Sequence, residues 1–141
     1  MPRNKIHMSI CRINNPPGTE DIYRRMKFSQ AVRIGDTVWV SGQVGGDEKG
    51  LVGEGIDAQA RLAFKNLAHV LADTGASPAD VVELMTFNTS MGDIRGFSKV
   101  RTDFIPENYP AWTAVGVKEL VMPQLLVEIK ATAVIGSRKA A

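Results

Sequence analysis

The chain has 141 residues, of which 44% are hydrophobic and 23% are charged, and its formal net charge is +2. This balance is typical of a globular domain large enough to bury a core, so residues 1–141 are predicted to form one domain. No apolar run approaches the ~20 residues that span a bilayer. The basic N-terminus lacks the apolar segment of a secretory signal. We therefore expect a cytoplasmic protein with no membrane partner.

Metal and nucleic-acid sites are not expected. Cys11 is the single cysteine, and the two histidines, His7 and His69, lie far apart in the chain, so neither a disulfide nor a dedicated metal site is predicted. Cys11 is expected to be a small buried strand residue, and His69 a residue on a helix surface. The basic residues are scattered, with no stripe that would suit a nucleic acid. No cofactor is expected.

The first half of the chain predicts an irregular start, a hairpin and a helix. Residues 1–25 are expected to be irregular because "NPPG" interrupts regular structure. Two short β-type runs then meet at Gly35–Asp36, which indicates a hairpin. A glycine-rich loop follows, without the Gly-Lys-Ser/Thr ending of a phosphate loop. Residues 57–73 have the apolar spacing of a helix, with Asp57 expected to cap its start and Gly75 its end.

The second half predicts a strand, a helix and two more strands. Residues 81–91 are β-rich, and a helix is expected between Asp93 and Pro106. Residues 111–118 and 125–135 both alternate with a period of two. The short "LVMPQ" link between them favours an antiparallel hairpin. The order β-β-α-β-α-β-β predicts an α+β fold, with a β-sheet and two helices packed on one face. Apolar members of the other face favour its burial against another subunit.

Two residues of the last strands are candidates for chemistry. The expected hairpin places Trp112 and Glu128 on the same face of the sheet, opposite Val115. Glu128 is either a solvated or salt-bridged carboxylate, with Lys130 or Lys118 as partner, or a desolvated group that orients or deprotonates a water. Trp112 is either a packing residue or a pocket wall that stacks on a ligand. Periodicity does not decide between these interpretations.

Three segments resemble the Rid family, also called the YjgF or endoribonuclease L-PSP family. They are "FSQAVRIGDTVWVSGQVGGDEKGLVGEG", "DVVELMTFNTSMGDIRGF" and "YPAWTAVGVKELVMPQLLVEIKATAV", and the resemblance runs from about residue 26 to 135. Characterised members are imine and enamine deaminases. The resemblance implies a chorismate-mutase-like α+β fold. It also implies a homotrimer whose sheets pack around a central barrel, with small-molecule ligands in three clefts between subunits.

The resemblance also implies a set of site residues. Glu128 matches the family glutamate that holds the water attacking the imine carbon, and is the expected catalytic residue. The expected ligand-binding residues are Phe28, Ser41, Gly42, Asn88, Trp112 and Ala114. Two positions depart from the family pattern. Trp112 stands where active members have an arginine that binds the substrate carboxylate, and Phe28 stands where many have a tyrosine.

Three functions remain open. The first is a metal-independent deaminase or hydrolase for an imine, enamine or related C=N compound that is not a standard 2-imino acid. The second is a non-catalytic ligand-binding or regulatory trimer. The third is an RNA-directed endoribonuclease or translation inhibitor, which the low net charge disfavours. Lys118, Arg33 or Arg101 of a neighbouring subunit is a candidate to replace the missing positive charge.

Overall fold

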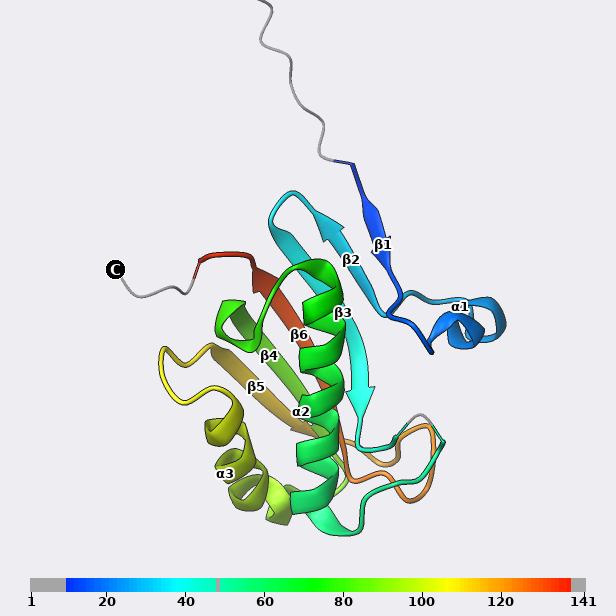
Figure 1. Ribbon diagram of the computed structural model, residues 1–141. Helices are drawn as coiled ribbons and strands as arrows, with labels where there is room; N and C mark the ends of the chain where they lie inside the picture. The colour runs from blue at the N-terminus through cyan, green and yellow to red at the C-terminus, as the bar shows by residue number, and fades with distance from the viewer. Residues whose placement is uncertain (1–9, 48, 138–141) are drawn as a thin grey trace, which may run out of the picture.

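The computed structural model describes residues 10–47 and 49–137 and has an α+β fold (Figure 1). The strands are β1 (Arg12–Asn14), β2 (Ala31–Ile34), β3 (Thr37–Val44), β4 (Val81–Asn88), β5 (Ala111–Gly116) and β6 (Val127–Val134). The helices are α1 (Glu20–Met26), α2 (Gly55–Thr74) and α3 (Ile94–Phe104), with 3₁₀ turns at Pro78–Asp80 and Met91–Asp93. The predicted ββαβαββ order is present from β2 onward.

The N-terminal segment is more regular than predicted. Within residues 10–25, β1 pairs with β2, with Ile13 opposite Val32, and α1 begins at Glu20. The Pro-Pro-Gly sequence lies between β1 and α1, so it interrupts regular structure only at that point. Cys11 is exposed, so the prediction that it is buried is wrong: it precedes a three-residue strand at the edge of the sheet. Residues 1–9, including His7, lie outside the described part.

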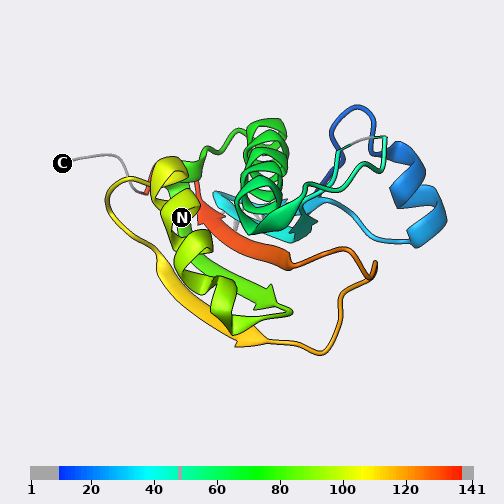
Figure 2. The same cartoon turned by 90° about the horizontal axis from the view of Figure 1, so that it is seen from below.

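The strands form one six-stranded mixed sheet, in the order β1-β2-β3-β6-β4-β5. All neighbours are antiparallel except β4 and β5, which are parallel because α3 connects them as a crossover helix. Figures 1 and 2 show α2 and α3 side by side on one face of this sheet. The predicted two-layer arrangement is therefore correct.

The predicted hairpin between the last two strands is wrong. β4 lies between β5 and β6, and it pairs with β6 from Val81 opposite Ala133 to Asn88 opposite Val127. The link from β5 to β6 therefore passes β4 instead of making a tight turn. A short loop is compatible with a hairpin, but its length does not reveal that β4, from earlier in the chain, pairs between β5 and β6.

The core lies between the helices and the sheet. Val127, Ile129, Ala131 and Ala133 of β6 are at most 2% exposed, as their alternation predicts. They pack in one cluster with buried residues of α2, α3 and the neighbouring strands, and Phe64 stacks on Phe97 across the two helices. The predicted helix-surface position of His69 is confirmed, since His69 is exposed on α2.

The opposite face of the sheet is uncovered in a single chain. Ile13, Ile34 and Trp39 are 55%, 39% and 43% exposed on it, and Glu128 and Lys130 of β6 point the same way. Because apolar side chains of three strands contribute, this face has the character of a contact surface.

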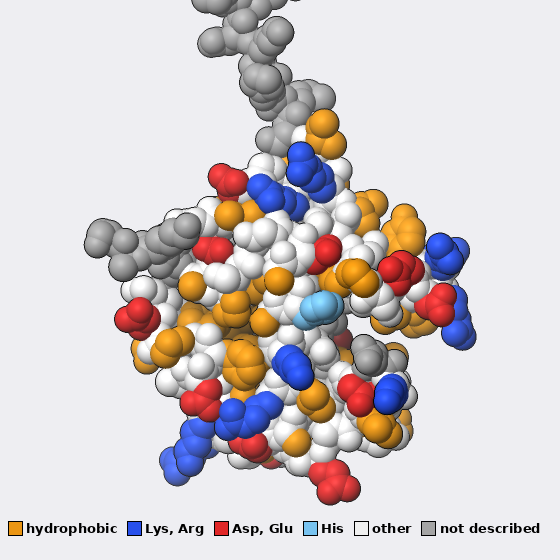
Figure 3. Space-filling view, in the orientation of Figure 1, with side chains coloured by type: hydrophobic (Ala, Val, Ile, Leu, Met, Phe, Trp, Pro, Cys, Tyr) orange, Lys and Arg blue, Asp and Glu red, His pale blue; other side chains and the backbone are white. Residues whose placement is uncertain are grey.

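The helix-covered side has a mixed charge. Basic and acidic side chains are interspersed over it in Figure 3, with apolar side chains between them. Among the described residues, no helix is both long enough and apolar enough to span a membrane.

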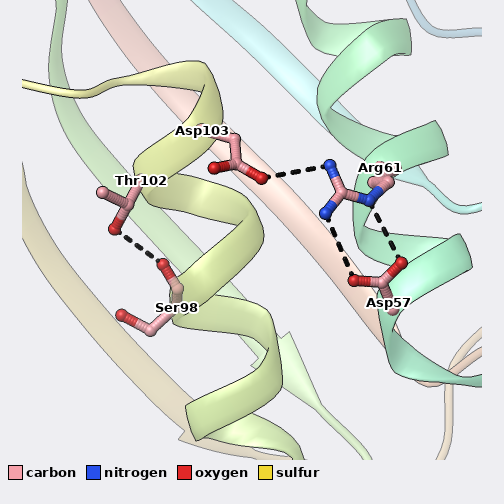
Figure 4. Close-up of polar contacts among 5 residues, drawn as sticks. All are labelled: Asp57, Arg61, Ser98, Thr102 and Asp103. Carbon is pink, nitrogen blue, oxygen red and sulfur yellow. Dashed lines mark hydrogen bonds and ion pairs between the residues drawn. The ribbon is translucent and has the colours of Figure 1, made fainter.

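α2 ends as predicted and begins differently. Gly75 follows its last residue with φ +90°, a left-handed conformation that suits glycine. Asp57 is not the N-cap, because Glu54 holds that position. Asp57 instead pairs with Arg61, whose guanidinium also contacts Asp103 of α3 at 3.1 Å (Figure 4). This charged group links the start of α2 to the end of α3.

Candidate functional site

Glu128 lies on β6, near the middle of the sheet, on the uncovered face. Its backbone neighbours are Val44 of β3 and Phe87 of β4. The alternation of β6 directs Val127 and Ile129 into the core and therefore directs Glu128 away from the helices. The strand thus fixes the carboxylate on a rigid element instead of a loop.

The electrostatic setting of Glu128 is unusual for a surface glutamate. The residue is partly buried, and loss of water around it raises the pKa of the carboxyl above its ordinary value of 4.5. The ion pairs among the described residues join Arg33 to Asp36 and Arg61 to Asp57 and Asp103, so neither Lys130 nor Lys118 neutralises Glu128. The salt-bridged interpretation is therefore not supported within one chain.

Gly42 provides space beside the carboxylate. A Cβ atom at this position would lie 2.5 Å from Glu128 Oε1 and 2.6 Å from its Cδ. The strand register shifts between Val40 and Gln43, so Gly42 lies in a β-bulge that turns its backbone toward Glu128. Any larger residue would displace the carboxylate.

Polar contacts hold the bulge in place. The Ser41 hydroxyl donates to the Ser29 carbonyl oxygen at 2.6 Å, and the Ser41 amide donates to the Gln30 carbonyl oxygen at 2.9 Å. The buried Gln43 side chain donates to Gln30 Oε1 at 2.9 Å. Phe28 comes directly before Ser29 and is 39% exposed. Phe28, Ser41, Gly42 and Glu128 are called the Glu128 cluster below.

Trp112 lies on the other face of the sheet. On β5 it is paired with Leu84 of β4, a fully buried core residue. Its Nε1–H donates to Thr86 Oγ1 at 3.0 Å, and its ring lies 5.8 Å from the ring of Phe97 on α3. The prediction that Trp112 and Glu128 share a face is therefore wrong. It followed from the hairpin, and inserting β4 between the two strands changes the register.

Asn88 and Ala114 lie on the same face as Trp112. Ala114 is paired with Thr86, and Asn88 with Gly116, so all of them line the β4–β5 edge under α3. Asn88 is fully buried, and neither its Oδ1 nor its Nδ2 has a hydrogen-bond partner among the described residues. A buried amide without partners is costly. Asn88, Trp112 and Ala114 are called the Trp112 cluster below.

The two clusters lie on opposite faces of one sheet. The structure brings Gly42 and its neighbour Ser41 to Glu128 and places Asn88 and Ala114 on the same face as Trp112. Within one chain the sheet separates the two clusters.

The sequence makes Arg101 of a neighbouring subunit a candidate to replace the missing positive charge. In the structure its guanidinium Cζ lies 4.6 Å from the Trp112 ring centroid of the same chain and 5.6 Å from that of Tyr109. Arg33, by contrast, donates to the carbonyl oxygens of Gly35 and Thr74. The four-residue spacing of Phe97 and Arg101 on α3 is the signal that places both over one residue of the sheet.

Comparisons with known proteins agree with this fold and with the resemblance. The model of the Endoribonuclease L-PSP family matches residues 19–135. The RutC family protein YjgH of Escherichia coli K12 is 38% identical over 104 residues, which are 72% of this chain and 79% of that protein. The solved structure of YjgH covers 88% of this chain and 95% of its own, with a TM-score of 0.79 and 35% identity.

Two further similar proteins carry names from the same family. A protein of Dermatophagoides farinae named 2-iminobutanoate/2-iminopropanoate deaminase is 36% identical over 95 residues, or 66% of this chain and 74% of that protein. The structure of RidA from an Antarctic Psychrobacter has a TM-score of 0.73 and 36% identity, covering 77% of this chain and 88% of its own. With most of its length matched by the family model, this chain belongs to the Endoribonuclease L-PSP family, also called the Rid or YjgF family.

Proposed function

We propose that this protein hydrolyses the C=N bond of a small imine, enamine or related compound, in clefts between the subunits of a cytoplasmic homotrimer. The observation that carries the proposal is Glu128: a partly buried, unpaired carboxylate whose pKa is raised by desolvation, with Gly42 leaving space beside it. Such a group can hold a water and accept its proton.

The reaction needs no electron transfer. The Glu128 carboxylate accepts a proton from water as the water oxygen bonds to the C=N carbon, and the proton then goes to the nitrogen. The hydroxyl proton of the resulting carbinolamine also passes to the nitrogen as the C=O bond forms and the C–N bond breaks, so an imine plus water becomes a carbonyl compound plus ammonia. The raised pKa of Glu128 makes it a better base than an ordinary glutamate.

The position of the two clusters supports a composite cleft. Gly42 lies against Glu128 and Ser41 precedes it, whereas Asn88 and Ala114 are on the other face with Trp112. We include Phe28 with Glu128 because it precedes Ser29, which accepts a hydrogen bond from Ser41. We propose that the Glu128 cluster of one subunit and the Trp112 cluster of the next form one ligand site. The uncovered apolar sheet face supplies the contact surface for such an assembly.

The substrate we propose differs from a standard 2-imino acid. Trp112 is uncharged, and its only N–H is already bonded to Thr86. Its contacts with Phe97 and Thr86 favour the packing interpretation over a ring free to stack on a ligand. An α-carboxylate is therefore not held by residue 112 in the way an arginine would hold it.

A panel of imines generated in situ tests the proposal. An amino-acid oxidase supplies 2-iminopropanoate, an amine oxidase supplies an imine without a carboxylate, and semicarbazide traps whatever remains. We expect the protein to lower semicarbazone formation from at least one imine. Equal trapping with and without protein across the panel would contradict the proposed hydrolysis.

A non-catalytic ligand-binding trimer is the second candidate. The uncharged Trp112 favours it, because residue 112 supplies no positive charge to orient the carboxylate of a substrate for reaction. Saturable binding of a metabolite without turnover of any imine would select this candidate. The RNA-directed function has no comparable support, since charges are mixed on the face in Figure 3 and the net charge is +2.

A further inference from the structure

Arg101 has no acidic side chain as an ion-pair partner among the described residues. It differs from the other described arginines without an ion pair, which are exposed, in being partly buried. Its Nε is buried and has no hydrogen-bond partner, and its one hydrogen bond, from an Nη to Ser98 Oγ, is long at 3.4 Å. A partly buried guanidinium with unsatisfied donors is costly unless something else binds it.

Two aromatic rings hold the guanidinium in place. Trp112 and Tyr109 lie 4.6 and 5.6 Å from its Cζ, within the range of cation–π contacts. Neither ring accepts the hydrogen bonds that the guanidinium edge offers. Trp112 is itself fixed by Thr86 and Phe97, so the rings form a rigid support. The result is a pre-positioned charge whose terminal nitrogens, unlike the buried Nε, remain available to an anion.

A second polar group without partners lies on the same face. Asn88 is fully buried at the end of β4, and both of its amide atoms lack partners. It lies two residues beyond Thr86, the residue that holds Trp112, which is about 7 Å along the strand. Their partners across β5 are the small residues Ala114 and Gly116, and the Met91 side chain lies beside Gly116. Because Trp112 is paired with Leu84, four residues before Asn88, the Asn88 amide is a further unpaired polar group of this face and is separate from the Arg101 contact.

We propose that Arg101 is the anion-binding and specificity-determining residue of this site, and that it holds the carboxylate of a small-molecule ligand beside Trp112. The positive charge is supplied from helix α3 instead of strand β5. The proposal rests on the proposed function for the identity of the cleft. It concerns which residue binds the anion.

The test measures binding and needs no turnover. The probes are 2-oxobutanoate and 4-oxopentanoate, which differ in the spacing of carbonyl and carboxylate, each beside its methyl ester as the uncharged match. Binding is followed by NMR through the indole N–H signals, with Trp39 as the internal reference on the other face. Wild type is compared with Arg101→Gln and Arg101→Lys. Lys99→Gln, an exposed cation on the same helix, is the matched control.

We expect wild type to bind at least one acid tenfold or more tightly than its ester, with the Trp112 signal shifting. Arg101→Gln should remove this preference while leaving ester binding unchanged, Arg101→Lys should retain part of it, and Lys99→Gln should retain all of it. Equal affinity of acid and ester for wild type overturns the proposal. An unchanged preference for the acid in both Arg101 variants also overturns it. An effect of Arg101→Gln on trimer stability alone overturns it as well, because Arg101 would then belong to a subunit contact. Imine hydrolysis by wild type is measured separately, so failure of the proposed hydrolysis and failure of anion binding by Arg101 can be distinguished.

Discussion

At the scale of single residues, Glu128 and Trp112 have different environments although the sequence predicts both on one face of the sheet. Alternation in β6 correctly directs Glu128 away from the core. Its desolvation depends on neighbours from β3 and β4, which the sequence pattern of one strand does not contain. The sequence predicts Trp112 on the face of Glu128 because it pairs β5 with β6, whereas β5 in fact pairs with β4. The sequence selects both residues as candidates, whereas the face on which each lies relative to the other depends on the strand order.

Glu128 is expected to reduce stability at neutral pH. Its raised pKa means that the folded chain binds the proton more tightly than the unfolded chain. Stability is therefore lost as pH rises from the ordinary pKa of 4.5 through the raised one. Glu128→Gln should raise the melting temperature at pH 7, and the gain should vanish below pH 4.5. Thermal unfolding across pH measures this, with the exposed Glu83→Gln as control. A gain that does not depend on pH would contradict the assigned cause.

The bond from Trp112 to Thr86 is expected to couple the two residues energetically. Trp112→Phe keeps a ring but leaves the fully buried Thr86 hydroxyl without its donor, at a cost of about 1–3 kcal/mol. In a Thr86→Val background the same change should cost less, giving a coupling of about 1 kcal/mol or more. Urea unfolding of the four proteins supplies the cycle. Additive effects would show that packing alone holds Trp112.

At the scale of elements, local patterns predicted the helices and strands from β2 onward better than the pairing of those strands. The spacing of α2 and the glycine at its end located that helix almost completely. The insertion of β4 between β5 and β6 depends on contacts between residues more than 40 positions apart, such as Leu84 and Ala131. No local period encodes that choice, so the faces of β5 relative to β6 were not predictable.

Two glycines at the end of β3 should respond differently to alanine. At Gly42 the new Cβ meets the Glu128 carboxylate, which can move, so stability should change little while imine hydrolysis falls. At Gly45 the new Cβ would lie 2.6 Å from Gln59 Cα, so α2 itself must shift, at a cost of about 1–3 kcal/mol. Urea unfolding and the imine assay on both variants separate the two effects. A Gly42→Ala protein that unfolds early, or that keeps full activity, would contradict this division.

At the scale of the whole molecule, the uncovered sheet face links architecture to function. A single chain exposes Trp39, Ile34 and Ile13 there and leaves the Glu128 and Trp112 clusters on opposite faces. The sequence predicted that this face is buried against another subunit, from its apolar members. One assembly would both cover the apolar face and complete the ligand site.

Sedimentation tests that assembly. Wild type should sediment at about three times the 15.3 kDa of one chain. Trp39→Glu places a charge in the apolar face and should yield smaller species without imine hydrolysis. Ala72→Glu, which adds the same charge on the exposed side of α2, should leave the assembly unchanged. A wild-type monomer that retains activity would contradict the composite site.

The central claim is that Glu128 carries the hydrolysis of a C=N bond, and the most direct measurement compares wild type with Glu128→Gln on an imine that wild type consumes. Semicarbazone trapping gives the rate, and sedimentation of the same samples verifies an unchanged assembly. We predict a rate lower by about 10²–10⁴-fold in Glu128→Gln, because the amide cannot accept the proton of the attacking water. A variant that hydrolyses the imine at the wild-type rate in an intact assembly would contradict the account.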